Sequence, residues 1–317
     1  MIMLSIITKF VQYFKEMDFR TEKDTIGEVK VKKDALWGPQ TQRSINNFKI
    51  GKAGSMPIEI IHAFAILKKA AAKANFDLGV LSKEKKELIS LVCDEIIDNK
   101  HNNQFPLVIW QTGSGTQTNM NINEVISNRA HQIEGNKLGE GTKFLSPNDD
   151  VNMSQSSNDT FPTAMHIATY KKLIESTIPN LEDFKSTLFE KSNEFKDVIK
   201  IGRTHLMDAT PITLGQEFSG YHSQIEHGLI IIKKLINSFI RTCIRVQLQL
   251  ELGLNSPKGY DKLVSKYISN ITGINFITAK NKFESIASHD AMVETHGALK
   301  LIANSLNKIA NDIRMMS

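Results

Sequence analysis

The chain has 317 residues, 41% hydrophobic and 23% charged, with a formal net charge of +5 at pH 7. This composition is typical of a globular protein with enough chain for one large domain or two ordinary ones. Lysines and arginines are scattered rather than clustered, which argues against a nucleic-acid partner and is compatible with a small anionic substrate. No apolar run is long enough to span a membrane. Cys93 and Cys243 lie far apart, so neither a disulfide framework nor a structural zinc site is expected.

The first residues form an apolar leader. Residues 1–14 contain neither arginine nor an acidic residue and lack a cleavage-site pattern, unlike secretory signals or mitochondrial transit peptides. We interpret residues 1–19 as an extension and expect Met17 to be the natural start. N-terminal sequencing of the endogenous protein that finds Met1 would contradict this. We expect a cytoplasmic location because the cysteines suit a reducing compartment, with the mitochondrion as the alternative.

Segment 24–50 opens the structured part of the chain. Its alternating apolar residues between positions 26 and 31 predict a short hairpin or extended arm, and Gly38-Pro39 predicts a turn. We expect the polar residues 40–44 to form an exposed loop. The alternative is that Thr41 and Arg43 face a site.

Two packing helices follow. Ser55 and Pro57 open the first, which is expected to run to about Asn75. Ser82 is the predicted cap of the second. The apolar face predicted for the second helix consists of Leu88, Leu91, Val92 and Ile96.

A Gly/Ser/Thr segment then interrupts an apolar run. Residues 112–116, Thr-Gly-Ser-Gly-Thr, combine backbone freedom with hydroxyls, and a helix is expected to begin near Asn119. This pattern predicts a cradle for a carboxylate or phosphate, with an ordinary turn as the alternative. The Gly-Lys-Ser/Thr ending of a P-loop is missing. Asn119, Asn121 and Asn123 are poor helix formers, so something other than propensity must select them.

A second polar stretch occupies residues 146–160 and contains almost no apolar side chain. We expect Pro162 to be the first residue of a long amphipathic helix that runs past Tyr170. The stretch would then be another helix N-terminus surrounded by amides and hydroxyls, where anions bind well. A solvent-exposed linker is the alternative.

A third polar cluster lies at residues 203–205, Arg-Thr-His, in a predicted short loop with Gly202 as a hinge. Pro211 blocks helix on its N-terminal side, and Thr213 with Gln216 forms a capping box that starts a long helix. Proteins display catalytic groups in this manner. Within this segment alone, the histidine is equally compatible with a capping or packing role.

Long helices dominate the rest of the chain. Apolar residues step by three and four from Leu214 to Ile236 and from Leu299 to Ile313, which predicts a bundle seam. We expect Ile309 and Ile313 to lack some apolar partners, and hence poor solubility or association. Four histidines on these helices have the wrong spacing for a metal pair and are predicted to be surface or packing residues: His222, His227, His289 and His296.

The three polar stretches together predict one composite site for a small polyanion, because hydroxyls, amides and helix N-termini bind carboxylates without adding negative charge. His205 is the group among them that titrates near neutrality, so it is the natural proton carrier. The predicted fold is mainly α. We expect a mixed or helical N-terminal domain over residues 20–150, followed by a long-helix bundle domain over residues 151–317.

Five motifs in order make the chain resemble the class II fumarases of the fumarase/aspartase superfamily, from about Arg20 to the last residue. They are LWGPQTQRS (36–44), WQTGSGTQTNMNINEV (110–125), SQSSNDTFPTAMH (154–166), GRTHLMDATPITLGQE (202–217) and NKFE (281–284). Aspartase-like chains typically carry Gln at the position of His205 and Thr at that of Ser157. The resemblance therefore favours a fumarase over an aspartate ammonia-lyase.

The resemblance implies reversible hydration of fumarate to malate in the tricarboxylic acid cycle, without metal or organic cofactor. It implies a mainly α-helical homotetramer whose active sites draw on three subunits. It also implies that the histidine, through a bound water, handles the proton of the departing hydroxyl. The residues that match the family's site are Ser114, Gly115 and Thr116 in a first substrate loop, Ser156, Ser157 and Asn158 in a second, the substrate-binding Thr204 and the catalytic His205.

Three features depart from the family pattern. The serine-loop motif GSSxMPxKxNP, which supplies the base, is not among the 317 residues, and VQLQLELGLN (246–255) replaces a Gly-rich GGTAVGTGLN segment. Ser146 stands where many relatives have His in a secondary dicarboxylate site, here matched by Ser146, Pro147, Asn148 and Asp149. We therefore expect the bundle domain over residues 151–317 to be truncated at its C-terminus, with little hydratase activity from these residues alone. The alternative is a non-catalytic remnant or helical interaction fragment, which the downstream nucleotide sequence would distinguish.

Overall fold

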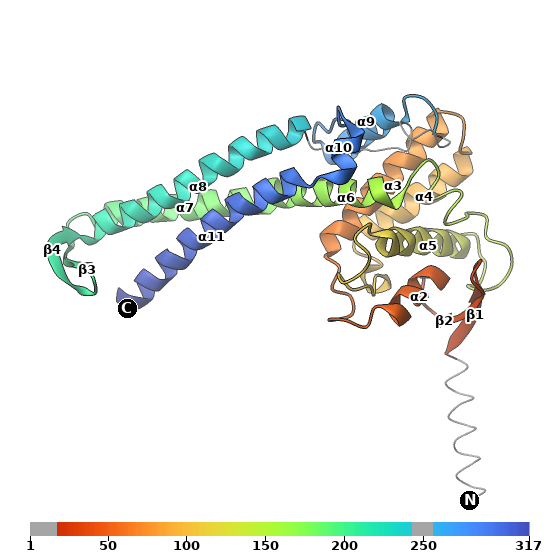
Figure 1. Ribbon diagram of the computed structural model, residues 1–317, viewed down its shortest axis with the longest axis horizontal. Coiled ribbons are helices and arrows are strands. Elements are labelled where there is room, and N and C mark those ends of the chain that lie inside the picture. The colour runs from red at the N-terminus through yellow and green to blue at the C-terminus, as the bar shows by residue number, and fades with distance from the viewer. Residues whose placement is uncertain (1–17, 243–255, 317) are drawn as a thin grey trace, which may run out of the picture. The chain divides into compact units, whose positions relative to one another are not determined.

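The computed structural model describes residues 18–242 and 256–316, and for residues 237–242, 285 and 286 it describes the backbone alone. The described residues leave out residues 1–17 and residues 243–255. The second of these ranges contains Cys243 and the VQLQLELGLN segment. Within them the chain is mainly helical with two small antiparallel sheets, which confirms the predicted mainly α fold class (Figure 1). None of the helices in this part of the chain is long and apolar enough to cross a membrane.

The described residues form two compact units. Unit 1 contains residues 18–168 and 256–287, and unit 2 contains residues 169–242 and 288–316. One of the boundaries between them, at residues 168 and 169, falls inside a continuous helix. The domain boundary expected at residue 150 stays a prediction.

Unit 1 begins with the predicted hairpin. Strands β1 (Phe19–Lys23) and β2 (Glu28–Lys32) pair antiparallel, with Val31 fully buried. The prediction of an exposed loop at residues 40–44 is wrong. These residues belong to helix α2 (Pro39–Asn47), in which Thr41 is buried. The Arg43 guanidinium forms an ion pair with Asp24 at 2.8 Å. The alternative that Thr41 and Arg43 face a site stays a prediction.

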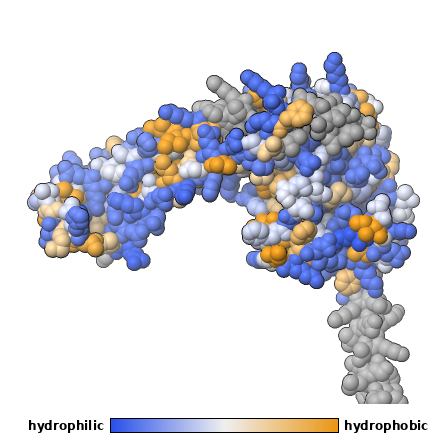
Figure 2. All heavy atoms as spheres, in the orientation of Figure 1, coloured by the Kyte–Doolittle hydropathy of each residue, from blue (hydrophilic) through white to orange (hydrophobic). Residues whose placement is uncertain are grey.

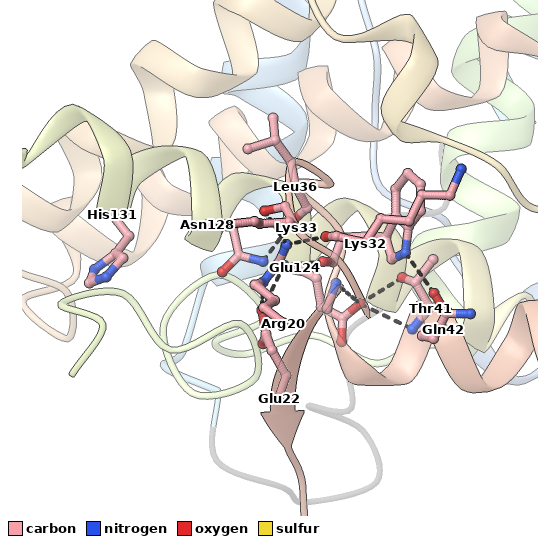
Figure 3. Close-up of polar contacts among 12 residues, drawn as sticks. Arg20, Glu22, Lys32, Lys33, Leu36, Thr41, Gln42, Glu124, Asn128 and His131 are labelled. Carbon is pink, nitrogen blue, oxygen red and sulfur yellow. Dashed lines mark hydrogen bonds and ion pairs between the residues drawn. The ribbon is translucent and has the colours of Figure 1, made fainter. Parts of the chain in front are cut away.

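The reason for this helix lies elsewhere in the sequence. Glu124, on the later helix α5 (Thr116–Ile133), accepts hydrogen bonds from the backbone amides of Gly38, Gln40 and Thr41 at 2.7–3.0 Å. The Thr41 hydroxyl donates a fourth at 2.6 Å, as Figure 3 shows. A carboxylate at a helix N-terminus satisfies donors that the helix itself leaves unpaired. Burial raises the pKa of Glu124, and these hydrogen bonds oppose that rise.

The core of unit 1 surrounds helix α3 (Ile58–Asp77), which packs against α4 (Lys83–Ile97), α5 and α9 (Tyr260–Thr272). The Ser82 cap on α4 is confirmed, since its hydroxyl accepts from the Lys85 amide at 3.3 Å. The predicted apolar face of α4 is partly wrong. Leu91 is 48% exposed, whereas Ile89 and Cys93 are buried on the face that meets α3.

Polar contacts tie the same helices together. On α4 and α5, Glu95 accepts two hydrogen bonds from the Arg129 guanidinium, at 2.7 and 3.0 Å, and this lowers the pKa of Glu95 to about 2. Two short elements complete unit 1, η1 (Asn102–Gln104) and α10 (Lys282–Ala287).

The expected helix start at Pro162 is also wrong. Helix α6 (Ser157–Lys172) begins five residues earlier and holds Pro162 in its interior. The start is fixed upstream because the Ser156 carbonyl accepts from the Thr160 amide at 3.0 Å, while Asp159 Oδ1 accepts from the Ser156 amide at 3.2 Å. The helix continues through the π-helical turn η2 (Leu173–Thr177) into α7 (Ile178–Glu194).

Unit 2 is built on long helices. Helix α8 (Leu214–Thr242) packs against both α7 and α11 (Asp290–Met316), as Figure 1 shows. The predicted seam is confirmed along α8, where the following side chains are buried: Tyr221, Ile225, Leu229, Ile232 and Ile236. The capping box is confirmed as well. Thr213 and Gln216 exchange side-chain-to-amide hydrogen bonds of 2.9 and 3.1 Å.

The seam on α11 differs from expectation at one position. Ile309 is only 2% exposed and therefore has its partners, whereas Ile313 is 40% exposed. On the face that Figure 2 shows, hydrophilic residues predominate among the coloured ones, and apolar residues form separate patches. The expected poor solubility stays a prediction.

Candidate functional site

The first predicted loop closes onto the start of α5, which begins at Thr116, three residues earlier than expected. Gly115 is the N-cap and has a φ of 67°. A Cβ there would lie 2.1 Å from a ring carbon of Phe161, so only glycine fits. Sequence reasoning missed Gln111, whose side-chain oxygen accepts from the Thr118 amide and hydroxyl, each at 3.0 Å. A polar residue shortly before a glycine-opened helix is the signal for such a cap.

The second predicted loop forms the start of α6 in the same unit. Ser156 and Ser157 are half-buried and Asn158 is exposed. The Ser156 hydroxyl accepts from the Asn158 amide at 3.3 Å, which fixes the turn that leads into the helix. The preceding Ser154 has a φ of 60°, a conformation that few residues other than glycine adopt.

The structure brings these two loops together. The Thr116 and Ser157 hydroxyl oxygens lie 2.8 Å apart, and Ser114 Oγ lies 3.1 Å from Thr116 Oγ1. The hydroxyls come from the first turns of two helices, whose N-termini carry partial positive charge. Such an arrangement offers hydroxyl and backbone donors to a carboxylate without bringing a fixed cation.

The third predicted cluster belongs to unit 2 and is not the short loop that we expected. It is a hairpin of β3 (Ile199–Thr204) and β4 (Met207–Thr213), with Thr204 paired to Met207. Gly202 is not a loop hinge either. It lies in β3 at a register irregularity, where a Cβ would approach the Thr210 carbonyl oxygen to 2.7 Å.

His205 occupies the tip of this hairpin. His205 and Leu206 form its two-residue turn with φ values of 53° and 61°, and both side chains are exposed. Positive φ at both turn positions matches the twist of the strands, although neither residue favours it. His205 lines a pocket of about 620 Å³ whose cationic side chains are already paired: Lys200 with Glu217, Arg203 with Asp208, and Lys308 with Asp312.

The sequence of the whole chain is similar to known proteins. A family model described as "Lyase" matches residues 27–317. The chain belongs to this lyase family. It is 62% identical to the class II fumarate hydratase of Pasteurella multocida (strain Pm70) and 61% identical to that of Haemophilus influenzae (strain ATCC 51907 / DSM 11121 / KW20 / Rd), each over 301 residues. The match covers 95% of the chain but only 64% of each relative, so the chain spans under two thirds of their length.

Solved structures agree with this family membership. A recombinant class II fumarase from Schistosoma mansoni matches 93% of this chain, with a TM-score of 0.84 and 37% identity, and 64% of its own chain is covered. A fumarate lyase:delta crystallin from Brucella melitensis matches 94%, also with a TM-score of 0.84 and 37% identity, and 67% of that chain is covered. The resemblance read from the motifs is confirmed.

Ser146, Pro147, Asn148 and Asp149, where the secondary dicarboxylate site is expected, form a turn. The Ser146 hydroxyl donates to Asp149 Oδ2 at 2.9 Å and accepts from the Asp149 amide at 3.1 Å. The neighbouring Asp150 is bound by Lys85 at 2.7 Å. The Ser146 hydroxyl is therefore engaged within the turn, next to the exposed Asp149 carboxylate. The secondary dicarboxylate site stays a prediction.

The four histidines predicted to be surface or packing residues of the long helices lie at or near the surface. Three of them are exposed and one is half-buried: His227, His289, His296 and His222. Within the described residues, no three His, Cys, Asp or Glu side chains gather in a way that would hold a metal ion.

Proposed function

We propose that this chain carries substrate-binding and proton-transfer groups of a fumarate hydratase, which interconverts fumarate and (S)-malate in the tricarboxylic acid cycle. The contact between Thr116 and Ser157 is the observation that carries the proposal. It joins two helix N-termini in a chain that belongs to the lyase family and is similar to class II fumarate hydratases. A dicarboxylate needs donors of this kind and no added negative charge.

The proposed binding groups of unit 1 are hydroxyls and backbone amides at the starts of α5 and α6, which hold carboxylates. In unit 2 the proposed binding group is the Thr204 hydroxyl beside His205. The full set consists of Ser114, Gly115, Thr116, Ser156, Ser157, Asn158 and Thr204. Donors already fixed in place stabilise charge that develops on a carboxylate without further reorganisation.

His205 is the proposed proton carrier. In malate dehydration a base removes a proton from C3, and the electron pair gives an enediolate-like carboxylate. The C2–OH bond then breaks, the hydroxyl takes a proton from His205 through a bound water, and fumarate and water leave. Hydration runs through the same steps in reverse. An imidazole suits this role because its ordinary pKa lies near neutrality.

The other candidate within the family is an aspartate ammonia-lyase. His205 and Ser157 favour the hydratase, because aspartase-like chains typically carry Gln and Thr at these positions. Nothing in the described residues favours a non-catalytic role. The proposal includes a homotetramer in the cytoplasm or, alternatively, the mitochondrion; sedimentation of the purified protein and fractionation of cells test these two parts.

Direct binding is the sharpest test, because the serine-loop motif is not among the 317 residues. Fumarate, malate and aspartate are titrated calorimetrically into the chain and into T116V and S157A variants. We expect malate and fumarate to bind, and each variant to weaken binding by at least about tenfold. The control is T187V, which removes an exposed hydroxyl on α7. Binding of aspartate alone would favour the ammonia-lyase, and no binding of any dicarboxylate would refute the proposal.

Turnover tests the histidine separately. Any fumarate hydration by the chain is expected to fall by about 100- to 10,000-fold in H205Q, since a positioned acid or base contributes that much. The matched control is H222Q, on α8, which should keep the rate. Equal rates for the two variants would remove His205 from the mechanism.

A further inference from the structure

Lys68 is a lysine buried in the middle of unit 1. It lies on α3 with a relative exposure of 0%. Its ammonium donates hydrogen bonds to Asn119 Oδ1 at 2.8 Å and Asn152 Oδ1 at 2.9 Å. A buried ammonium is costly unless its donors are satisfied, so the fold holds these two acceptors in place around it. No role for this lysine follows from the groups already assigned to the site.

The two asparagines connect Lys68 to the two loops through hydrogen bonds. Asn119 stands in the first turn of α5, three residues after Thr116, and its Oδ1 also accepts from the Thr160 hydroxyl at 3.2 Å. Asn152 donates to the Gln155 carbonyl at 3.2 Å, just before the second loop. Lys68 is therefore the shared hydrogen-bond donor behind both helix starts.

Asn152 also bonds two of the three asparagines that helix propensity left unexplained, Asn119 and Asn123. Its Oδ1 accepts from Asn119 Nδ2 at 3.1 Å and Asn123 Nδ2 at 3.3 Å, in addition to Lys68. Three donors on one oxygen fix the orientation of the Asn152 amide, because the reversed amide would place donors against donors. This network explains why Asn119 and Asn123, both poor helix formers, stand near the start of α5.

The charges around Lys68 are few and buried. Asp159 on α6 and Cys93 on α4 interact with it electrostatically. Burial lowers the pKa of Lys68 to about 7 and raises the pKa of Asp159 well above its ordinary value. Asp159 Oδ2 is buried without a hydrogen-bond partner among the described residues, so Lys68 supplies its compensating electrostatic attraction.

We propose that Lys68 is a positioning residue. Through Asn119 and Asn152 it holds the starts of α5 and α6 at the spacing at which Thr116 and Ser157 meet. Its role in dicarboxylate binding rests on the proposed function. Its role in holding the two loops does not.

The test compares K68M with K69M in the whole chain. Lys69 is the neighbouring residue on α3 and pairs with Asp94 at 2.6 Å instead of with the loops. Hydrogen exchange is followed in segments 112–120 and 152–162, and malate affinity is measured on the same samples. We expect K68M to speed exchange in both segments by at least about tenfold and to leave α4 and α9 unchanged. K69M should leave both segments protected.

Selective loosening with weaker malate binding supports the proposal in full. Selective loosening in a chain whose wild type binds no dicarboxylate supports the positioning role and refutes the proposed function. Exchange that rises equally in α4 and α9, or equally in K69M, overturns the positioning role, because loss of a merely structural contact would loosen α3 and its neighbours together. Should K68M fail to fold, N152A removes one arm of the network, and unchanged exchange in segment 152–162 would likewise overturn it.

Discussion

The two regions that carry the candidate groups hold them in different ways. In unit 1, Thr116 and Ser157 meet in front of a buried network of amides around Lys68. In unit 2, Thr204 and His205 are exposed at a hairpin, where strand pairing and a strained turn set their direction. The proposed groups of unit 1 are thus fixed by side chains far apart in the sequence, and the proposed groups of unit 2 are fixed by local backbone geometry.

The two regions are therefore sensitive to different kinds of mutation. A buried polar network fails when one partner is lost, because the remaining donors or acceptors stay buried and unpaired. A two-residue turn tolerates most changes of side chain. Its stability changes when a substitution alters how readily a turn residue adopts positive φ. Three variants separate these behaviours.

The largest effect is expected from Glu124 in unit 1. E124Q replaces an acceptor of four hydrogen bonds by an amide whose NH2 faces donors, so we expect unfolding free energy to fall by about 3 kcal/mol. Urea unfolding measures the change. E134Q is the control, because Glu134 is exposed just beyond the end of the same helix. Equal midpoints for the two variants would show that this carboxylate does not organise unit 1.

A smaller loss of stability is expected from a change in the first loop, residues 112–116. G115A forces a Cβ toward the Phe161 ring at a residue with a φ of 67°, which should destabilise unit 1 by about 2 kcal/mol. G113A in the same loop meets nothing within 4 Å and serves as the control. Thermal unfolding of both variants decides the matter. A G115A protein as stable as G113A would mean that the loop moves away from Phe161 freely.

The smallest effect, and one of opposite sign, is expected at the hairpin of unit 2. L206G relieves a left-handed conformation at a φ of 61° and should stabilise the hairpin by roughly 1 kcal/mol. M207G, one residue later in β4, should destabilise it because glycine weakens a strand. We expect the amides of β3 and β4 to exchange more slowly in L206G and faster in M207G. The reverse order would show that the turn is unstrained.

Elements governed by near neighbours were predictable. The capping box at Thr213 and Gln216 and the cap at Ser82 each join residues three apart. The α8 seam follows from helical periodicity. The hairpin that carries His205 was missed because His-Leu is not a turn sequence: strand pairing imposes the turn, and the two residues adopt it against their preference.

By itself, the sequence determined the family, the mainly α fold and the identity of the polar helix starts, because motifs and periodicity are local properties of the chain. Only the tertiary structure decided what holds those starts. Gly38 and Glu124 are 86 residues apart, and Lys68 and Asn152 are 84 apart, so no local pattern pairs them. Buried polar groups must find partners wherever the fold supplies them, and that requirement placed α2, the start of α5 and the Thr116–Ser157 contact.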